Sequence, residues 1–87
     1  MFVRRDFTKG QVWLSSENGD YFEYIKDAYQ SGVNLVNAGK IDRFDILTED
    51  GEVVCRDESW SADEYEEVGL DRNGDNPKYA DCWERKE

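Results

Sequence analysis

The sequence predicts a small α+β domain. We expect a mainly antiparallel β-sheet, built from two hairpins and a short C-terminal strand, with one amphipathic helix packed on a face and a second, short acidic helix. Turn signals separate two pairs of strand-like segments, and one segment has the period of a helix that buries one face. With 87 residues, the chain has room for one small core, so residues 1–87 are assigned to a single domain.

The first hairpin is predicted from two short strand-like segments on either side of a turn. Residues 2–7 and 11–15 are the two segments, and the turn residues Thr8-Lys9-Gly10 lie between them. Trp13 falls in the second segment. Because large rings bury much apolar area, we expect Trp13 to lie in the core.

The longer helix is predicted over residues 21–31, where apolar residues recur at helical spacing. Asp20 precedes it as the candidate N-cap, and Gly32 stands where a left-handed residue would end it. The following residues 33–40 are expected to return the chain to the sheet. The predicted apolar face consists of Phe22, Ile25, Ala28 and Tyr29.

The second hairpin has the clearest pattern in the chain. Residues 41–48 and 52–57 flank Asp50-Gly51, a pair that favours a two-residue type I′ turn. This turn sets a register that pairs mostly apolar residues on one face and opposite charges on the other. The pairs so predicted are Thr48/Val53, Ile46/Cys55, Phe44/Asp57, Leu47/Val54, Asp45/Arg56 and Arg43/Glu58.

A short helix over residues 62–68 is predicted from a capping box. In this motif Ser61 accepts a hydrogen bond from the backbone N–H of Glu64, and the Glu64 side chain reaches back to Ser61. Trp60 and Tyr65 occupy the two positions of a hydrophobic staple. Gly69 follows as the expected terminator.

Beyond this helix, residues 71–78 are predicted to form a polar loop and residues 79–83 a last short strand. The loop begins like a calcium-binding loop, but Cys82 stands where such a loop needs a bidentate Glu. A polar turn is therefore preferred over a calcium site.

Charge is distributed unevenly along the chain, and this asymmetry is the strongest functional signal. Residues 1–44 carry six acidic and six basic residues, so the whole net charge of −10 lies in residues 45–87. Within residues 45–71 there are eleven acidic residues and one basic residue, Arg56. Such a segment would repel nucleic acids and anionic membranes and attract a basic partner. An acidic face that only keeps the protein soluble is the alternative.

No catalytic residue, cofactor or metal site is predicted. The chain has no His, which is the commonest general base, and no Cys-x-x-Cys pair for zinc. Cys55 falls on a predicted apolar face, and the acidic neighbours of Cys82 would not activate a thiolate. Because residues 1–10 lack the pattern of a signal peptide, both cysteines are expected to be free thiols.

We therefore expect a non-catalytic binding protein. It would occupy the basic, nucleic-acid-binding surface of a partner protein, as an inhibitor or nucleic-acid mimic. Carboxylates would supply the attraction, and two aromatic residues would serve as contact anchors. The alternative for these two, which the staple positions favour, is that they are core residues. The expected partner-binding residues are Asp45, Glu49, Asp50, Glu52, Asp57, Asp63, Glu66, Glu67, Asp71, Trp60 and Tyr65.

By size and charge alone, the chain resembles the stand-alone inhibitors that phages and mobile elements encode against host nucleases, repair enzymes and defence complexes. Because residues 1–10 lack the pattern of a signal peptide, we expect a cytoplasmic protein, in the host cell if phage-encoded. We expect no direct nucleic-acid binding, no membrane association, and a monomer or small homo-oligomer. The alternative is a small structural or assembly protein that oligomerises through exposed aromatic residues such as Trp60 and Trp83.

Overall fold

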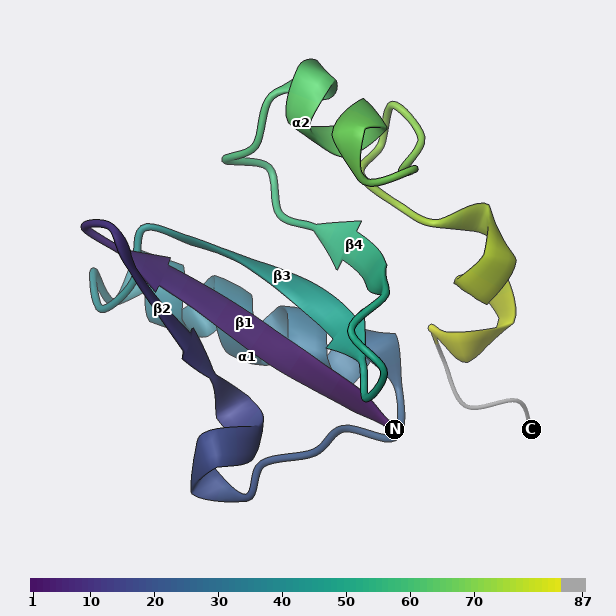
Figure 1. The fold of residues 1–87 in the computed structure, drawn as a ribbon. Helices are drawn as coiled ribbons and strands as arrows, with labels where there is room; N and C mark the ends of the chain where they lie inside the picture. The colour runs from purple at the N-terminus through teal and green to yellow at the C-terminus, as the bar shows by residue number, and fades with distance from the viewer. Residues whose placement is uncertain (84–87) are drawn as a thin grey trace.

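The computed structural model describes residues 1–83 and shows one four-stranded antiparallel sheet in the order β2-β1-β3-β4 (Figure 1). Helix α1 lies across one face of this sheet, and α2 lies beyond β4. The predicted α+β class is confirmed. The elements are β1 (Phe2–Thr8), β2 (Gln11–Leu14), η1 (Ser15–Asn18), α1 (Ile25–Asn37), β3 (Arg43–Thr48), β4 (Val53–Arg56), α2 (Ala62–Glu67) and η2 (Pro77–Cys82), of which η1 and η2 are 3-10 helices.

The first hairpin forms as predicted, but its second strand lies at the edge of the molecule. Lys9 and Gly10 both have positive φ, 48° and 84°, as a type I′ turn requires. Val12 and Trp13 on β2 are 52% and 51% exposed, so the prediction that Trp13 lies in the core is wrong. The reason is that α1 packs mainly on β1 and β3, which leaves β2 largely uncovered.

Helix α1 begins four residues later than predicted. Phe22 exchanges two backbone hydrogen bonds with Phe2, of 2.7 and 2.9 Å, and these bonds draw residue 22 into a bridge with β1. The helix therefore starts at Ile25, and its N-cap is Tyr24 rather than Asp20.

Gly32 lies inside α1 instead of ending it. A Cβ atom added at Gly32 would lie 2.6 Å from the ring of Phe44, so this glycine is what allows α1 to approach β3 so closely. The chain continues as helix to Asn37, and the left-handed residue after the helix is Gly39, with φ of 72°. The prediction that Gly32 ends the helix is wrong because tertiary packing, not a turn, requires the glycine.

The second hairpin closes through three residues, Glu49-Asp50-Gly51, rather than through two. The Thr48 N–H donates to the Glu52 carbonyl at 2.9 Å, and Gly51 has φ of 96°. A type I turn followed by a left-handed glycine has this arrangement. The predicted two-residue turn is therefore wrong.

The longer turn changes the pairing of the residues next to it and leaves the pairs farther from it as predicted. Asp45 pairs with Arg56 and Ile46 with Cys55 as predicted, but Leu47 pairs with Val53 across a β-bulge. Val54 is the extra residue, so the predicted pairs Leu47/Val54 and Thr48/Val53 are wrong. Strand β4 ends at Arg56, and Glu58 is an exposed loop residue, not a cross-strand partner of Arg43.

Two apolar clusters cover the two faces of the sheet. The first lies between α1 and the sheet, and it is built on Phe2, Ile25, Ala28, Phe44, Ile46, Val54 and Cys55. The second joins the opposite face to the α2 region through Leu47, Val53, Trp60, Tyr65 and Leu70. Because both faces are covered, residues on both sides of β3 and β4 are buried.

The predicted C-terminal strand is wrong, because residues 79–83 lie largely within the 3-10 helix η2. A segment just before it runs along β4 instead. The Arg56 N–H donates to the Gly74 carbonyl, and the Asn76 N–H donates to the Val54 carbonyl, both at 2.9 Å. These bonds cover the β4 edge of the sheet, so β2 is the open edge within the described residues.

Candidate partner-binding surface

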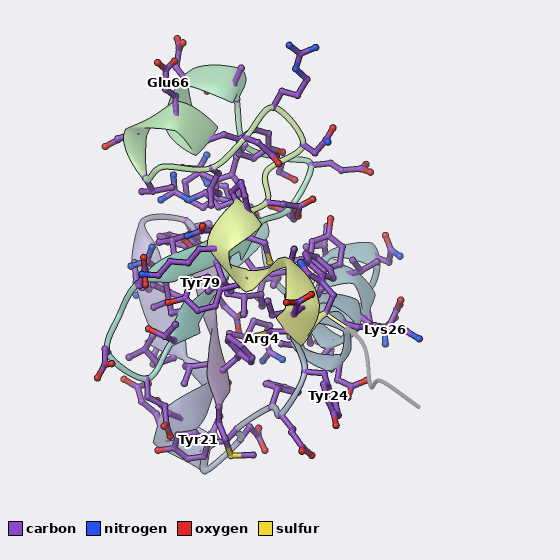
Figure 2. The ribbon with its side chains drawn as sticks, turned by 90° about the vertical axis from the view of Figure 1, so that its right-hand side faces the viewer. Arg4, Tyr21, Tyr24, Lys26, Glu66 and Tyr79 are labelled. Carbon is purple, nitrogen blue, oxygen red and sulfur yellow. The ribbon has the colours of Figure 1, made fainter. Side chains whose placement is uncertain are left out.

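Helix α2 presents three carboxylates to solvent. Asp63, Glu66 and Glu67 are exposed and lie at positions i, i+3 and i+4, which places their Cβ atoms about 5–6 Å apart. Across residues 1–83, none of the three forms an ion pair. Figure 2 shows Glu66 at one extreme of the molecule and Tyr21 at the other. We call Asp63, Glu66 and Glu67 the α2 acidic surface.

The predicted capping box positions this helix. Ser61 Oγ accepts from the Glu64 N–H at 3.3 Å, and Glu64 Oε1 accepts from the Ser61 N–H at 3.0 Å. The backbone hydrogen bond from Ser61 is the main reason that the pKa of Glu64 lies below its usual value. Arg43 Nη1 also lies 3.2 Å from Glu64 Oε2. Glu64 is therefore engaged twice and does not belong to the free acidic surface.

Trp60 and Tyr65 are structural residues, not surface anchors. They are only 7% and 9% exposed and belong to the second apolar cluster. The indole N–H of Trp60 donates to the Phe44 carbonyl at 2.8 Å, and the Tyr65 hydroxyl donates to the Asp57 carbonyl at 2.7 Å. Their predicted role as partner-binding residues is wrong, because both rings and their polar atoms are used to hold α2 to the sheet.

Two basic residues of the sheet pack against the segment that carries α2. The guanidinium carbons of Arg43 and Arg56 each lie 3.9 Å from the centroid of the Trp60 ring. Arg56 Nη1 also donates to the Glu64 carbonyl at 2.6 Å. Both arginines are thus bound to residues 60–64, whereas Arg72, in the loop after α2, is exposed. No local sequence signal indicates these Arg–Trp contacts, because they join three separate segments.

Asp45 is fully buried and does not belong to any surface. Its carboxylate receives two hydrogen bonds from Arg5, of 2.9 and 2.6 Å, and one from Arg56 of 3.2 Å. Its predicted role as a partner-binding residue is wrong, because the second covered face of the sheet places it inside.

The three remaining acids of the β3–β4 turn are exposed but belong to a different end of the molecule. In Figure 1 this turn lies close to the N-terminus, whereas α2 lies at the opposite side of β4. Glu52 accepts from the Tyr79 hydroxyl and pairs with Lys78 at 3.4 Å, and the bond from Tyr79 is the main reason that its pKa is lowered. Glu49 lies 3.8 Å from the N-terminal amine, and Asp50 is exposed. The predicted continuous acidic face is therefore divided into two.

Asp71 has a structural task in the loop after α2. Its Oδ1 accepts from the backbone N–H groups of Asn73 and Asp75, at 2.9 and 3.1 Å, while its side chain remains exposed. Within residues 1–83, no group of three or more His, Cys, Asp or Glu side chains is arranged to hold a metal ion. Residues 71–75 form a polar turn that the hydrogen bonds to Asp71 close.

Asp57 is buried, contrary to its predicted place on the surface. It is 5% exposed, and burial raises its pKa, although hydrogen bonds from Ser59 and the nearby charge of Arg43 act in the opposite direction. Asp57 lines a hollow beside Tyr29 together with Glu58. Glu58 is not among the predicted partner-binding residues, because the predicted register pairs it with Arg43.

Both cysteines are free thiols, as predicted. Cys55 is fully buried in the first apolar cluster, and this burial is the main cause of a raised pKa for its thiol. A thiol with a raised pKa is a poor nucleophile at neutral pH. Cys55 is therefore a core residue.

Comparisons with known proteins assign no family to the chain. No protein-family model matches the chain, and neither the curated proteins nor the solved structures contain a match. Among residues 1–83, no helix combines the length and apolar character that crossing a membrane requires.

Proposed function

We propose that this chain is a non-catalytic binding protein that engages a basic surface of a partner protein through the α2 acidic surface. The observation that supports this is the separation of charge around α2. Asp63, Glu66 and Glu67 face solvent, whereas Arg43 and Arg56 lie against Trp60. A one-signed surface of this kind attracts an oppositely charged partner and speeds its association.

The backbone that carries the α2 acidic surface is anchored to the sheet. The capping box fixes the start of the helix, and the buried Trp60 and Tyr65 fix the underside. The three exposed side chains still lose rotamer freedom when a partner binds, but the helix need not fold first. An anchored helix therefore supports a binding role over an acidic segment that serves only solubility.

The proposed partner surface is one that otherwise binds nucleic acid. Proteins that bind DNA or RNA neutralise several phosphates with Lys and Arg side chains, and such a cluster would attract a chain with a net charge of −10. By covering that cluster, this protein would exclude the nucleic acid and act as an inhibitor. Direct binding of nucleic acid by the chain itself is opposed by the same charge.

A pair of charge-reversal variants tests the proposal. Glu66→Lys/Glu67→Lys changes the α2 acidic surface, and Glu17→Lys/Glu23→Lys makes the same change of charge at exposed positions outside it. Wild-type protein captures its partner from lysate of its native host at low salt, and the affinity for the purified partner is then measured with each variant. We expect the α2 variant to lose binding and the control to retain most of it. Equal losses, or affinity that does not fall with salt, would contradict the proposal.

The inhibitory step is tested separately with the purified partner and a labelled DNA or RNA duplex. We expect wild-type protein to displace the duplex as its concentration rises, while the Glu66→Lys/Glu67→Lys variant does not. A ternary complex of partner, duplex and this protein would refute the competition and leave the binding proposal standing.

A second candidate function, assembly through exposed aromatic residues, is supported by one observation at the opposite end of the sheet. Val12 and Trp13 lie on the open edge strand β2 and are about half exposed. Open edges can pair with a second chain. Trp60 and Trp83, which the sequence analysis named for this role, are buried and half-buried. Light scattering after size exclusion tests the idea, because Val12→Lys should turn a salt-resistant oligomer into a monomer.

A further inference from the structure

A hollow of about 210 Å³ lies between α1 and the loop that joins β4 to α2. Tyr29, Val33 and Val36 line it from α1, and Phe44 lines it from β3. Its volume is below the range of about 300–1,000 Å³ that is typical of sites for small-molecule ligands. The hollow is therefore of a size for one side chain rather than for a cofactor.

The loop contributes two carboxyl groups to this largely apolar hollow, those of Asp57 and Glu58. Asp57 is more than nine-tenths buried, and its Oδ1 has no hydrogen-bond partner among the described residues. Ser59 and the backbone of Phe44 hydrogen-bond the carboxyl group, so Oδ1 is the part of the group that is left without a donor. Buried polar atoms nearly always have a partner, because leaving one unpaired costs folding free energy. The orphaned oxygen beside a hollow points to a donor that arrives from outside.

We infer that this hollow receives one lysine side chain of the partner protein. Oδ1 is covered from solvent, so a turn of the Asp57 side chain would bring it onto the hollow, where the ammonium group would donate to it. The exposed Glu58 would add a second negative charge. The aliphatic stem would lie against Val33 and Val36, as lysine stems do on apolar surfaces. The inference deepens the proposed function and rests on it, since the lysine would belong to the same basic partner.

Lysine fits the hollow better than arginine for a geometric reason. A guanidinium group prefers to donate two parallel hydrogen bonds to both oxygens of one carboxylate, whereas an ammonium group acts as a point donor. Ser59 already engages the Asp57 carboxyl group, and Oδ1 is the atom left without a partner. Because a single oxygen of the carboxyl group lacks a donor, a group that donates one hydrogen bond, such as ammonium, matches it better than a guanidinium group that donates two.

Small probes test the site without the partner. Isotope-labelled protein is titrated with n-butylammonium, which reproduces the lysine stem and head, with n-propylguanidinium, and with 1-butanol as the uncharged counterpart. We expect saturable NMR shifts at Tyr29, Val33, Val36 and Glu58 with n-butylammonium, weaker binding of the guanidinium probe, and no saturation with 1-butanol. Equal binding of 1-butanol, or shifts confined to the α2 acidic surface, would overturn the inference.

Variants identify the acceptor. Asp57→Asn should weaken n-butylammonium binding about tenfold or more, which is the effect of losing one charged hydrogen-bond partner. The exposed Glu58→Gln should weaken it a few-fold, and it serves as the second variant if Asp57→Asn does not fold. Glu66→Gln removes the same charge away from the hollow and should leave the probe affinity unchanged. If both Asp57→Asn and Glu58→Gln bind the probe like wild type, the lysine site is refuted.

The two proposals fail in different ways. If n-butylammonium does not bind, the lysine site is wrong, but the charge-reversal result at Glu66 and Glu67 still decides the proposed function. If charge reversal leaves partner binding unchanged while the probe binds the hollow, the proposed function is wrong. The hollow would then bind an ammonium group, but not as part of that function.

Discussion

The indole N–H of Trp60 lies 2.8 Å from the backbone carbonyl of Phe44 and donates a hydrogen bond to it. This bond ties Trp60, which lies next to the N-cap residue of α2, to β3, which is an inner strand of the sheet. Because Ser61 follows Trp60 and caps the helix, the bond also fixes where the α2 acidic surface stands.

Replacing Trp60 with Phe should destabilise the protein by about 0.5–1.5 kcal/mol, because the buried carbonyl of Phe44 loses the shorter of its two hydrogen bonds and keeps only the one from the Asp57 N–H at 3.3 Å. Urea unfolding measures the change. Trp13→Phe is the matched control, since Trp13 is half exposed and the same replacement there should stay within about 0.5 kcal/mol. Similar losses for both variants would show that the Trp60 bond is not the cause.

Replacing Gly32 with Ala should destabilise the protein although alanine favours helices. The helix propensity gained is about 1 kcal/mol, but the added Cβ would lie 2.6 Å from the Phe44 ring, and overpacking costs about 1–3 kcal/mol. The exposed Asn34→Ala is the control and should change stability by no more than about 0.5 kcal/mol. Thermal unfolding that shows Gly32→Ala to be more stable than wild type would contradict the close packing of α1 on β3.

Replacing Asp45 with Asn should cost about 3–5 kcal/mol of unfolding free energy, because the buried Arg56 and its neighbour Arg5 lose their counter-charge. Glu67→Gln is the control, since it removes the same charge from an exposed position and should cost little. Chemical denaturation compares the two. A loss for Asp45→Asn no larger than that of Glu67→Gln would mean that the buried ion pairs do not form.

Asp57→Asn should change stability in a pH-dependent way. Burial raises the pKa of Asp57 above 3.8, so the folded protein binds this proton more tightly than the unfolded chain does. The ionised carboxylate therefore lowers stability above the raised pKa, and the variant should be the more stable protein at pH 7. The difference should shrink as the pH falls and vanish below about 3.8, where both states of wild type are protonated.

Unfolding curves of wild type, Asp57→Asn and Glu67→Gln across this pH range isolate the contribution of Asp57. The exposed Glu67→Gln corrects for the change in net charge. Tyr29 lines the same hollow and has a pKa raised to about 12, mainly by burial, so it stays neutral throughout. A stability difference between Asp57→Asn and wild type that is constant with pH would refute the raised pKa.

The local motifs of this chain were predictable because each is complete within a few residues. Lys9-Gly10 forms the first turn, and Ser61 and Glu64 form the capping box with the predicted bonds. Glycines were harder to interpret. Gly32 and Gly51 both lie in apparent turn signals, but the packing of Phe44 decides the role of Gly32, and Gly51 closes a loop one residue longer than expected.

The candidate site was predicted in part. Asp63, Glu66 and Glu67 are exposed as expected, whereas Asp45, Asp57, Trp60 and Tyr65 are buried. The difference arises because residues 57–70 fold back beside β4 and cover the second face of the sheet. Alternation along a strand cannot separate inside from outside when both faces are covered.

The sequence by itself determined the α+β class, the two hairpins, the capped acidic helix and the excess of negative charge, since these depend on composition and near neighbours. Only the tertiary structure decided which carboxylates face solvent. Asp45 turns inward to two arginines, and Asp57 is buried beside a hollow, although both belong to the same acidic stretch as Glu66. The physical reason is that burial and counter-charge come from segments far apart in the chain, and a charge count does not contain them.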